Sequence, residues 1–227
     1  MTATVGVVLF PGTNCEHDVV AAVDGLDGHG RLVWHGDTSL GDVDALVLPG
    51  GFAHGDYLRP GAIARFSPIM AAIEAFASAG GPVVGICNGF QVLTEAHLLP
   101  GALGRNAGLA FVCAPTDLEV VSDRSVLTAG VPIGRRLRIP INHFEGNYLC
   151  DPRTLAELRA EGRIVLRYVD NPNGSVDDIA AITNAAGNVV GLMPHPERAC
   201  DPLVGGVDGR VLLGALLRSA GVAVSRA

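Results

Sequence analysis

The sequence predicts an α/β fold, a doubly wound and mostly parallel sheet with helices on both faces and a small antiparallel β patch. Short apolar runs alternate with segments of helical periodicity, as expected for parallel strands joined by crossover helices. The first run, residues 4–10 (TVGVVLF), is apolar throughout, which is typical of a strand buried on both faces. The chain has 227 residues and is 48% hydrophobic, enough for one core. We therefore expect residues 1–227 to form a single domain.

The first half predicts strands and helices in regular alternation. Ser67 followed by Pro68 indicates a helix start, with an N-cap and a proline in the first turn. The sequence Pro-Gly-Gly at 49–51 ends a strand sharply. The expected strands are 4–10, 31–35, 44–48 and 82–86, and the expected helices are 15–26, 67–79 and 89–96.

The second half changes character at about residue 109. Residues 109–148 contain short β-like pieces interrupted by Pro115, Pro132 and Pro140, which predicts the antiparallel patch. Asp151-Pro152 then caps a helix. The remaining expected elements are strands at 164–169, 179–183 and 189–193, a turn at 171–174 and a helix at 208–220.

The charge composition excludes several classes of function. All 16 basic residues are arginine, so the chain lacks a P-loop lysine, a protein-kinase lysine and a Schiff-base lysine. The formal net charge of −7 argues against nonspecific binding to nucleic acid or to an anionic membrane. If the reaction needs ATP, we expect another polypeptide to bind it.

The cysteines and the apolar segments indicate the compartment. There are five cysteines, an odd number, and none has C-x-x-C spacing. The apolar start lacks a basic region and stops at Pro11, and no apolar run reaches the ~20 residues that span a bilayer. We expect a reduced, cytoplasmic protein.

The segment VVGICNGFQ (83–91) predicts a nucleophile. Cys87 lies between an expected strand and an expected helix, with Gly85 and Gly89 two residues to either side. This is the thiol form of the G-x-S-x-G elbow, in which the tight turn leaves no room for neighbouring side chains. The helix N-terminus also favours the reactive thiolate.

A nucleophilic cysteine needs a base, and the segment MPHPE (193–197) supplies a candidate. His195 and Glu197 are two residues apart in an extended stretch after a strand, so both side chains can share one face. The carboxylate can then hold the imidazole while its other nitrogen faces Cys87. A metal site is not expected, because no complete ligand set accompanies these residues.

The turn LPGGF (48–52) predicts the third component. Gly50 and Gly51 leave backbone N–H groups approachable at the end of a strand, which an oxyanion hole requires. The N–H of Asn88, directly after the nucleophile, is the second expected donor.

Taken together, GICNGFQ, MPHPE and LPGG resemble the triad-type, or class I, glutamine amidotransferases. Five stretches are similar, more specifically, to the glutaminase subunits of phosphoribosylformylglycinamidine synthase, and the similarity covers about residues 5–214. These stretches are FPGTNCEHD (10–18), GDYLR (55–59), GICNGFQ (85–91), NPNGS (171–175) and HPERA (195–199).

The resemblance implies a division of labour within a complex. This chain would hydrolyse glutamine through Cys87, His195 and Glu197, and would need no cofactor. A large synthase subunit would use ATP, Mg²⁺ and the ammonia to aminate formylglycinamide ribonucleotide, and a small subunit would bridge the two.

The resemblance also implies which residues bind glutamine. It places Gly51, Phe52 and Asn88 at the oxyanion hole and pocket backbone, and Gln91 against the bound substrate. Asn142 and His143 would line the pocket. Phe144 departs from the glycine usual in the family, and Cys15 is interpreted as a packed thiol. Asp56 and Arg59 would order a loop, meet a partner or form a solvated ion pair.

Three alternatives remain open at this point. The glutaminase could serve another amination, since the triad would look similar there. An elbow cysteine also occurs in hydrolases related to DJ-1 and the intracellular proteases, but those place a histidine where this chain has Asn88. A regulatory subunit with a decayed site is disfavoured because all three triad positions are filled.

Overall fold

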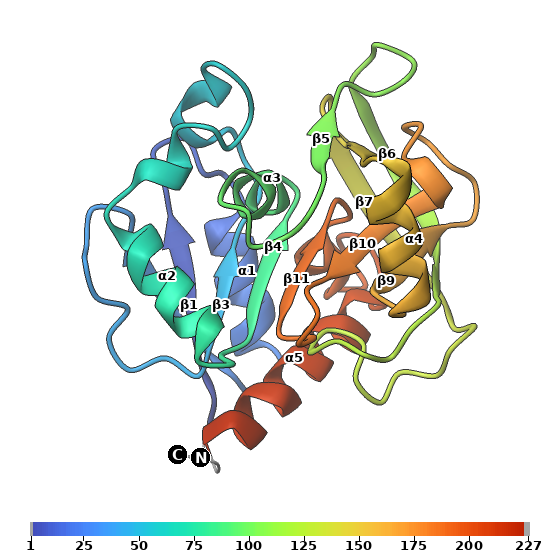
Figure 1. Cartoon of the computed structure of the whole chain (residues 1–227). Helices are drawn as coiled ribbons and strands as arrows, with labels where there is room; N and C mark the ends of the chain where they lie inside the picture. The colour runs from blue at the N-terminus through green and yellow to red at the C-terminus, as the bar shows by residue number, and fades with distance from the viewer. Residues whose placement is uncertain (1, 225–227) are drawn as a thin grey trace.

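The computed structural model describes residues 2–224, with side chains to residue 221. Nine strands form one mixed sheet in the order β2-β1-β3-β4-β11-β10-β9-β6-β7. Figure 1 shows the N-terminal half of this sheet on the left and the later strands on the right. The strands are β1 (Thr4–Leu9), β2 (His29–Trp34), β3 (Ala45–Leu48), β4 (Val83–Ile86), β6 (Val112–Val120), β7 (Arg136–His143), β9 (Ile164–Tyr168), β10 (Ile179–Thr183) and β11 (Val189–Leu192).

The parallel half confirms the predicted α/β fold. Strand β1 pairs in parallel with β2 and β3, β3 pairs with β4, and β4 pairs with β11. Every residue of β3, β4 and β11 is buried, so layers cover both faces of the sheet there. The carboxyl ends of these strands therefore lie together at one edge, where open α/β sheets place their ligands.

The helices follow the predicted positions closely. They are α1 (Glu16–Asp24), α2 (Ile69–Ser78), α3 (Asn88–Glu95), α4 (Pro152–Ala160) and α5 (Gly209–Val224). Helix α3 contacts β3, β4 and β11, whereas α1 and α5 contact each other and the 3-10 turn η4 (Pro196–Ala199). Within the described residues, no helix is long and apolar enough to cross a membrane.

The antiparallel part is more extensive than the small patch that the sequence predicts. Strands β11, β10, β9, β6 and β7 are joined by antiparallel pairings, and β5 (Ala102–Gly104) and β8 (Asn147–Leu149) form a separate pair. The prolines expected to interrupt this region do not all do so, because Pro115 and Pro140 lie directly opposite each other within β6 and β7. The Pro140 carbonyl points away from β6, toward the His195 N–H. Its ring nitrogen points the same way, so no bond of the ladder is lost.

One predicted cap is wrong in detail. Helix α2 begins after Pro68 without a side-chain cap, and the Ser67 hydroxyl instead lies 3.2 Å from Nδ1 of His35. The Ser67 carbonyl still accepts a bond from the N–H of Met70. The Ser-Pro pattern therefore marks the correct helix start, although a tertiary contact takes the side chain that was expected to cap it.

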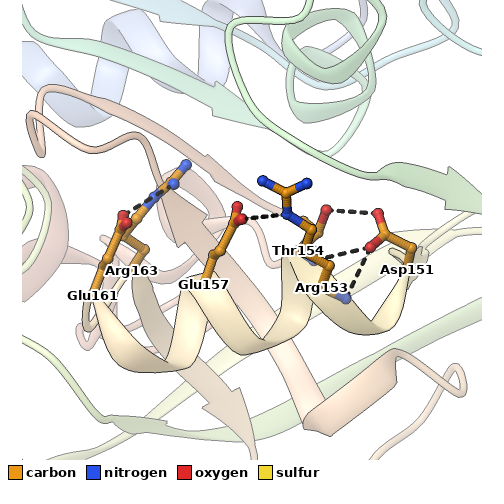
Figure 2. A network of polar contacts seen from close by, with 6 residues as sticks. All are labelled: Asp151, Arg153, Thr154, Glu157, Glu161 and Arg163. Carbon is orange, nitrogen blue, oxygen red and sulfur yellow. Dashed lines mark hydrogen bonds and ion pairs between the residues drawn. The ribbon is translucent and has the colours of Figure 1, made fainter.

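The predicted cap of α4 is present, as Figure 2 shows. The Asp151 carboxylate accepts bonds from the N–H groups of Arg153 and Thr154 at 2.9 and 3.0 Å, and from the Thr154 hydroxyl at 2.7 Å. These bonds satisfy backbone donors that the first turn leaves free, and they hold the pKa of Asp151 below its usual value.

We expect Asp151→Ala to lower the free energy of unfolding by more than the loss of a nearby exposed ion pair does, because the free N–H groups lose their acceptor. The matched control is Glu157→Ala, which removes only an exposed ion pair to Arg153 one turn away, worth about 0.3–0.5 kcal/mol. Urea denaturation of both variants gives the two values. Equal losses would contradict a capping role for Asp151.

Candidate active site

Cys87 occupies the strained turn that the sequence predicts. It lies between β4 and α3 with φ 51° and ψ −105°, a conformation that is rare for a residue with a side chain. Its N–H donates to the Leu192 carbonyl at 2.7 Å, which ties the turn to β11. Cys87 is the N-cap residue of α3.

The glycines beside Cys87 are required by close approach of the backbone. A Cβ atom at Gly89 would lie 1.9 Å from the Leu48 carbonyl oxygen, and one at Gly85 would lie 2.6 Å from the backbone of Gly89. Helix α3 can therefore sit directly on β3 and β4 only if both positions lack side chains. This contact is the physical basis of the elbow pattern.

His195 and Glu197 meet as the spacing predicts. His195 follows β11, and its Nδ1 lies 2.6 Å from Oε1 of Glu197, with both side chains almost fully buried. Burial disfavours the charged ring, but the Glu197 carboxylate and the Cys87 and Cys15 thiols outweigh it and raise the pKa of His195 well above its usual value. The free Nε2 has no hydrogen-bond partner among the described residues.

Gly50 joins the histidine to the two nearby cysteines. A Cβ atom at Gly50 would lie 2.7 Å from Cε1 of His195, 3.2 Å from Sγ of Cys15 and 3.4 Å from Cβ of Cys87. Three groups from distant parts of the chain thus converge on one residue without a side chain. The Gly50 carbonyl accepts bonds from the N–H groups of Asn14 and Cys15, which fixes the segment around it.

In the turn after β3, the Phe52 N–H is not available as the oxyanion donor that the resemblance implies. The Phe52 N–H donates to the Gly12 carbonyl at 2.8 Å, so it is already engaged. The neighbouring Gly51, at φ 147°, makes no hydrogen bond through its N–H among the described residues. The Asn88 N–H, at the first position of α3, has no partner within its helix. Among the described residues, the N–H groups of Gly51 and Asn88 therefore stay free, whereas that of Phe52 does not.

The side chains of Asn88 and Gln91 brace the wall of the site. Asn88 Nδ2 donates to Gln91 Oε1 at 2.8 Å, and Gln91 Nε2 donates to the Glu145 carbonyl at 2.6 Å. Both side chains are buried. The amide of Gln91, expected to contact the substrate, therefore also anchors the segment after β7.

A cavity of about 270 Å³ opens onto these groups. Of the predicted site residues, it is lined by Gly51, Phe52, Cys87, Gln91, Asn142, His143 and His195. Residues for which the sequence suggested another role or none also line it: Asn14, Cys15, Asp56, Phe144, Glu145 and Arg198. Glu197 lies behind His195 and lines a neighbouring cavity.

Cys15 and Arg198 line the cavity, a position that the sequence did not predict for either residue. Cys15 is buried, as expected of a packed thiol, but its Sγ accepts a bond from Nη2 of Arg198 at 3.1 Å beside the triad. Asp18 holds the other side of the same guanidinium at 3.4 Å. The only sequence signal was their presence in the stretches that resemble the family. Arg59, by contrast, forms an exposed pair with Glu95.

His143 is held as a neutral acceptor. Asn106 Nδ2 donates to two backbone carbonyls, so its Oδ1 accepts from Nδ1 of His143 at 3.1 Å. Burial, followed by the charge on His195, lowers the pKa of His143 to about 4. Its Nε2 is buried and lacks a partner among the described residues, which leaves a bare lone pair in a residue that lines the cavity.

Asp56 gives the cavity a negative wall together with Glu145. Asp56 is partly buried, and this burial, with repulsion from Glu145, raises its pKa to about 6 despite a hydrogen bond from Asn88. The protonated form is thus favoured by folding. Stability from this group is fully present below the unfolded pKa of about 4 and is lost as the pH rises through about 6.

We therefore expect Asp56→Asn to stabilise the chain at pH 7.5 by about 1 kcal/mol, after allowance for solvent screening, and to have no effect at pH 4. Thermal unfolding at both pH values measures the difference. Asp42→Asn, at an exposed position, is the matched control. A stabilisation that does not change between pH 4 and pH 7.5 would contradict the burial of this carboxylate as its cause.

Comparisons with known proteins place this chain in a family. Residues 2–206 match the CobB/CobQ-like glutamine amidotransferase domain. The chain therefore belongs to this family of glutamine amidotransferases. At 14% identity and a TM-score of 0.70, a putative GMP synthase component from Thermoplasma acidophilum shares the fold over 100% of this chain and 98% of its own.

More similar proteins narrow the assignment. Phosphoribosylformylglycinamidine synthase subunit PurQ of Rubrobacter xylanophilus is 55% identical, covering 96% of this chain and 99% of its own. The same subunit of Parasynechococcus marenigrum is 57% identical, covering 94% and 99%. A chain in the structure of PurLQS from Thermotoga maritima is 41% identical with a TM-score of 0.89, covering 96% and 99%. The chain is thus a member of the PurQ subunits.

Proposed function

We propose that this chain hydrolyses L-glutamine to glutamate and ammonia for phosphoribosylformylglycinamidine synthase, in de novo purine biosynthesis. The observation that carries the proposal is the meeting of Cys87, on its strained turn, with a buried His195–Glu197 pair at one cavity. Close relatives that carry the PurQ name support the pathway.

The first half of the reaction forms a thioester. Cys87 Sγ attacks the side-chain amide carbon of glutamine, and His195 holds the thiol proton at Nε2. The carbonyl oxygen becomes an oxyanion that accepts bonds from the Gly51 and Asn88 N–H groups. His195 then protonates the amide nitrogen, the C–N bond breaks and ammonia leaves.

The second half regenerates the enzyme. His195 removes a proton from a water molecule, which attacks the γ-glutamyl thioester. The C–S bond breaks, glutamate leaves and Cys87 recovers its proton. Glu197 acts throughout by orienting the imidazole and by stabilising its cationic form.

The cavity suits a small amino acid. Its volume of about 270 Å³ is just below the range of roughly 300–1,000 Å³ typical of pockets for drug-sized ligands. Asp56 and Glu145 offer a negative wall for the α-ammonium of glutamine, while Arg198 contributes a positive charge. Asn142 and His143 complete the lining on the side of β7.

The ammonia goes to one of two partner chains in the same complex. A large ATP-dependent synthase subunit converts formylglycinamide ribonucleotide to its amidine, and a small subunit bridges the two chains. This chain needs no cofactor or resident metal of its own, since ATP and Mg²⁺ act on the large subunit. We also propose that residues 1–227 act as one glutamine amidotransferase domain in the cytoplasm, without nucleic acid or membrane as a partner.

Labelling with a diazo-ketone analogue of glutamine tests the assignment directly. We expect a single adduct, located by peptide mapping on Cys87, whose formation is suppressed by free glutamine. The reaction is run on the chain alone and on the complex with its synthase partners. An adduct on another cysteine, or none in the folded complex, would refute the proposed mechanism.

A further inference from the structure

A second group of potential ligands overlaps the triad. Sγ of Cys15, one ring nitrogen of His195 and one carboxylate oxygen of Glu197 all lie within 4.8 Å of one another, and all three residues are buried. Thiolate, imidazole and carboxylate are the donors that Zn²⁺ takes in proteins. Mg²⁺ prefers an all-oxygen shell, so this mixed set discriminates against it.

Two polar atoms of this group lack partners. His195 Nε2 and Glu197 Oε2 are buried without a hydrogen bond among the described residues. The two residues are only 1% and 6% exposed. A buried acceptor without a partner costs free energy, which a cation bound by Glu197 Oε2 would recover. Cys15 brings its sulfur to the group from the N-terminal segment, where the Arg198 guanidinium donates to it at 3.1 Å.

We propose that Cys15, His195 and Glu197 bind Zn²⁺ reversibly and that this binding switches off glutamine hydrolysis. The inhibitory part of this inference depends on the proposed function, whereas the binding part does not. Cys15 gives the site its preference for zinc, because it supplies the sulfur ligand. When no zinc is bound, His195 and Glu197 serve the triad.

The geometry needs only a small adjustment. In a tetrahedral zinc site with bonds of about 2.0–2.3 Å, the ligand atoms are about 3.5 Å apart. Atoms at the outer limit of 4.8 Å must therefore close in by about 1 Å, whereas Nδ1 of His195 and Oε1 of Glu197, now 2.6 Å apart, must separate. Cys15 and His195 line the active-site cavity, which gives the ion an entry path and leaves a coordination position for water. Arg198 can continue to donate a hydrogen bond to the sulfur without binding the ion. The negative charges of Cys15 and Glu197 offset the positive charge of Arg198.

Inhibition follows from binding at the nitrogen of His195 that faces Glu197. Coordination through Nδ1 breaks the 2.6 Å bond to Glu197 that orients the ring. The base is lost while the synthase partner is untouched.

The activity test uses the complete synthase complex with added ZnCl₂. We expect zinc to suppress glutamine-dependent synthesis, a chelator to restore it, and ammonia-dependent synthesis to continue. Each variant is compared with its own metal-free rate. Cys15→Ser should require ~10-fold or more additional zinc for half-inhibition, whereas Cys113→Ser, at an exposed cysteine, should match the wild type.

A binding test separates this inference from the proposed function. Co²⁺ added to the chain should give a thiolate-to-cobalt absorption band that persists in Cys87→Ser and disappears in Cys15→Ser, whether or not the protein hydrolyses glutamine. Equal zinc sensitivity of Cys15→Ser and the wild type, or a cobalt band that does not depend on Cys15, would overturn the proposal. If the band behaves as expected but glutamine is not hydrolysed, only the proposed function fails.

Discussion

Cys87→Ser is expected to reduce glutamine-dependent synthesis by the complex at least ~10³-fold while ammonia-dependent synthesis keeps its rate. A serine hydroxyl at this position is a far weaker nucleophile than a thiol, since its oxygen is almost fully protonated at neutral pH. The ammonia-dependent reaction bypasses this chain's chemistry and takes place on the synthase partner. Steady-state rates with glutamine and with ammonium chloride measure the two activities in one preparation.

The matched control for this variant is Cys113→Ser, which changes an exposed thiol on β6 and should leave both rates unchanged. If Cys87→Ser lowered both rates equally, Cys87 would be needed for the integrity of the complex rather than for the chemistry. Analytical gel filtration of the assembled variant distinguishes lost chemistry from lost assembly.

Gly89→Ala is expected to destabilise the chain by about 3 kcal/mol or more, at the upper end of the cost of overpacking. The new methyl group would lie 1.9 Å from the Leu48 carbonyl oxygen, and backbone atoms of β3 cannot move aside as a flexible side chain could. Relief requires α3 to shift, which displaces Cys87 at its N-terminus. We therefore expect a lower unfolding temperature together with loss of glutamine hydrolysis.

Gly108→Ala is the control for this prediction, because a Cβ atom there meets nothing within 4 Å. Thermal unfolding and glutaminase activity are measured for both variants. A Gly89→Ala protein with wild-type stability would mean that α3 does not rest on β3 as closely as the structure shows.

The parts of the fold and site that depend on local pattern were predictable from the sequence. The elbow could be recognised because Gly85 and Gly89 must be small wherever a strand turns directly into a helix above it. His195 and Glu197 could be paired because residues two apart in extended chain face the same way. The cap of Asp151 likewise depends only on its own turn.

Other features depend on contacts that span the chain and leave no local signal. Pro115 and Pro140 are each expected to interrupt a strand when the sequence around them is considered alone. In the structure they lie opposite each other, and this register lets both strands continue. Phe52 is expected to offer a free N–H, but a bridge between Thr13 and Gly51 aligns that group with Gly12. Cys15 and Arg198 are 183 positions apart, so their contact could not be predicted from spacing.

That contact has a consequence for how the protein acquires activity during synthesis. β4 pairs with β11, which is made about one hundred residues later, and Arg198 closes onto the N-terminal segment through Cys15 and Asp18. A nascent chain that has not yet released residue 198 from the ribosome therefore holds Cys87 without its base. Glutamine is therefore spared until this later segment has emerged and closed onto the N-terminal one.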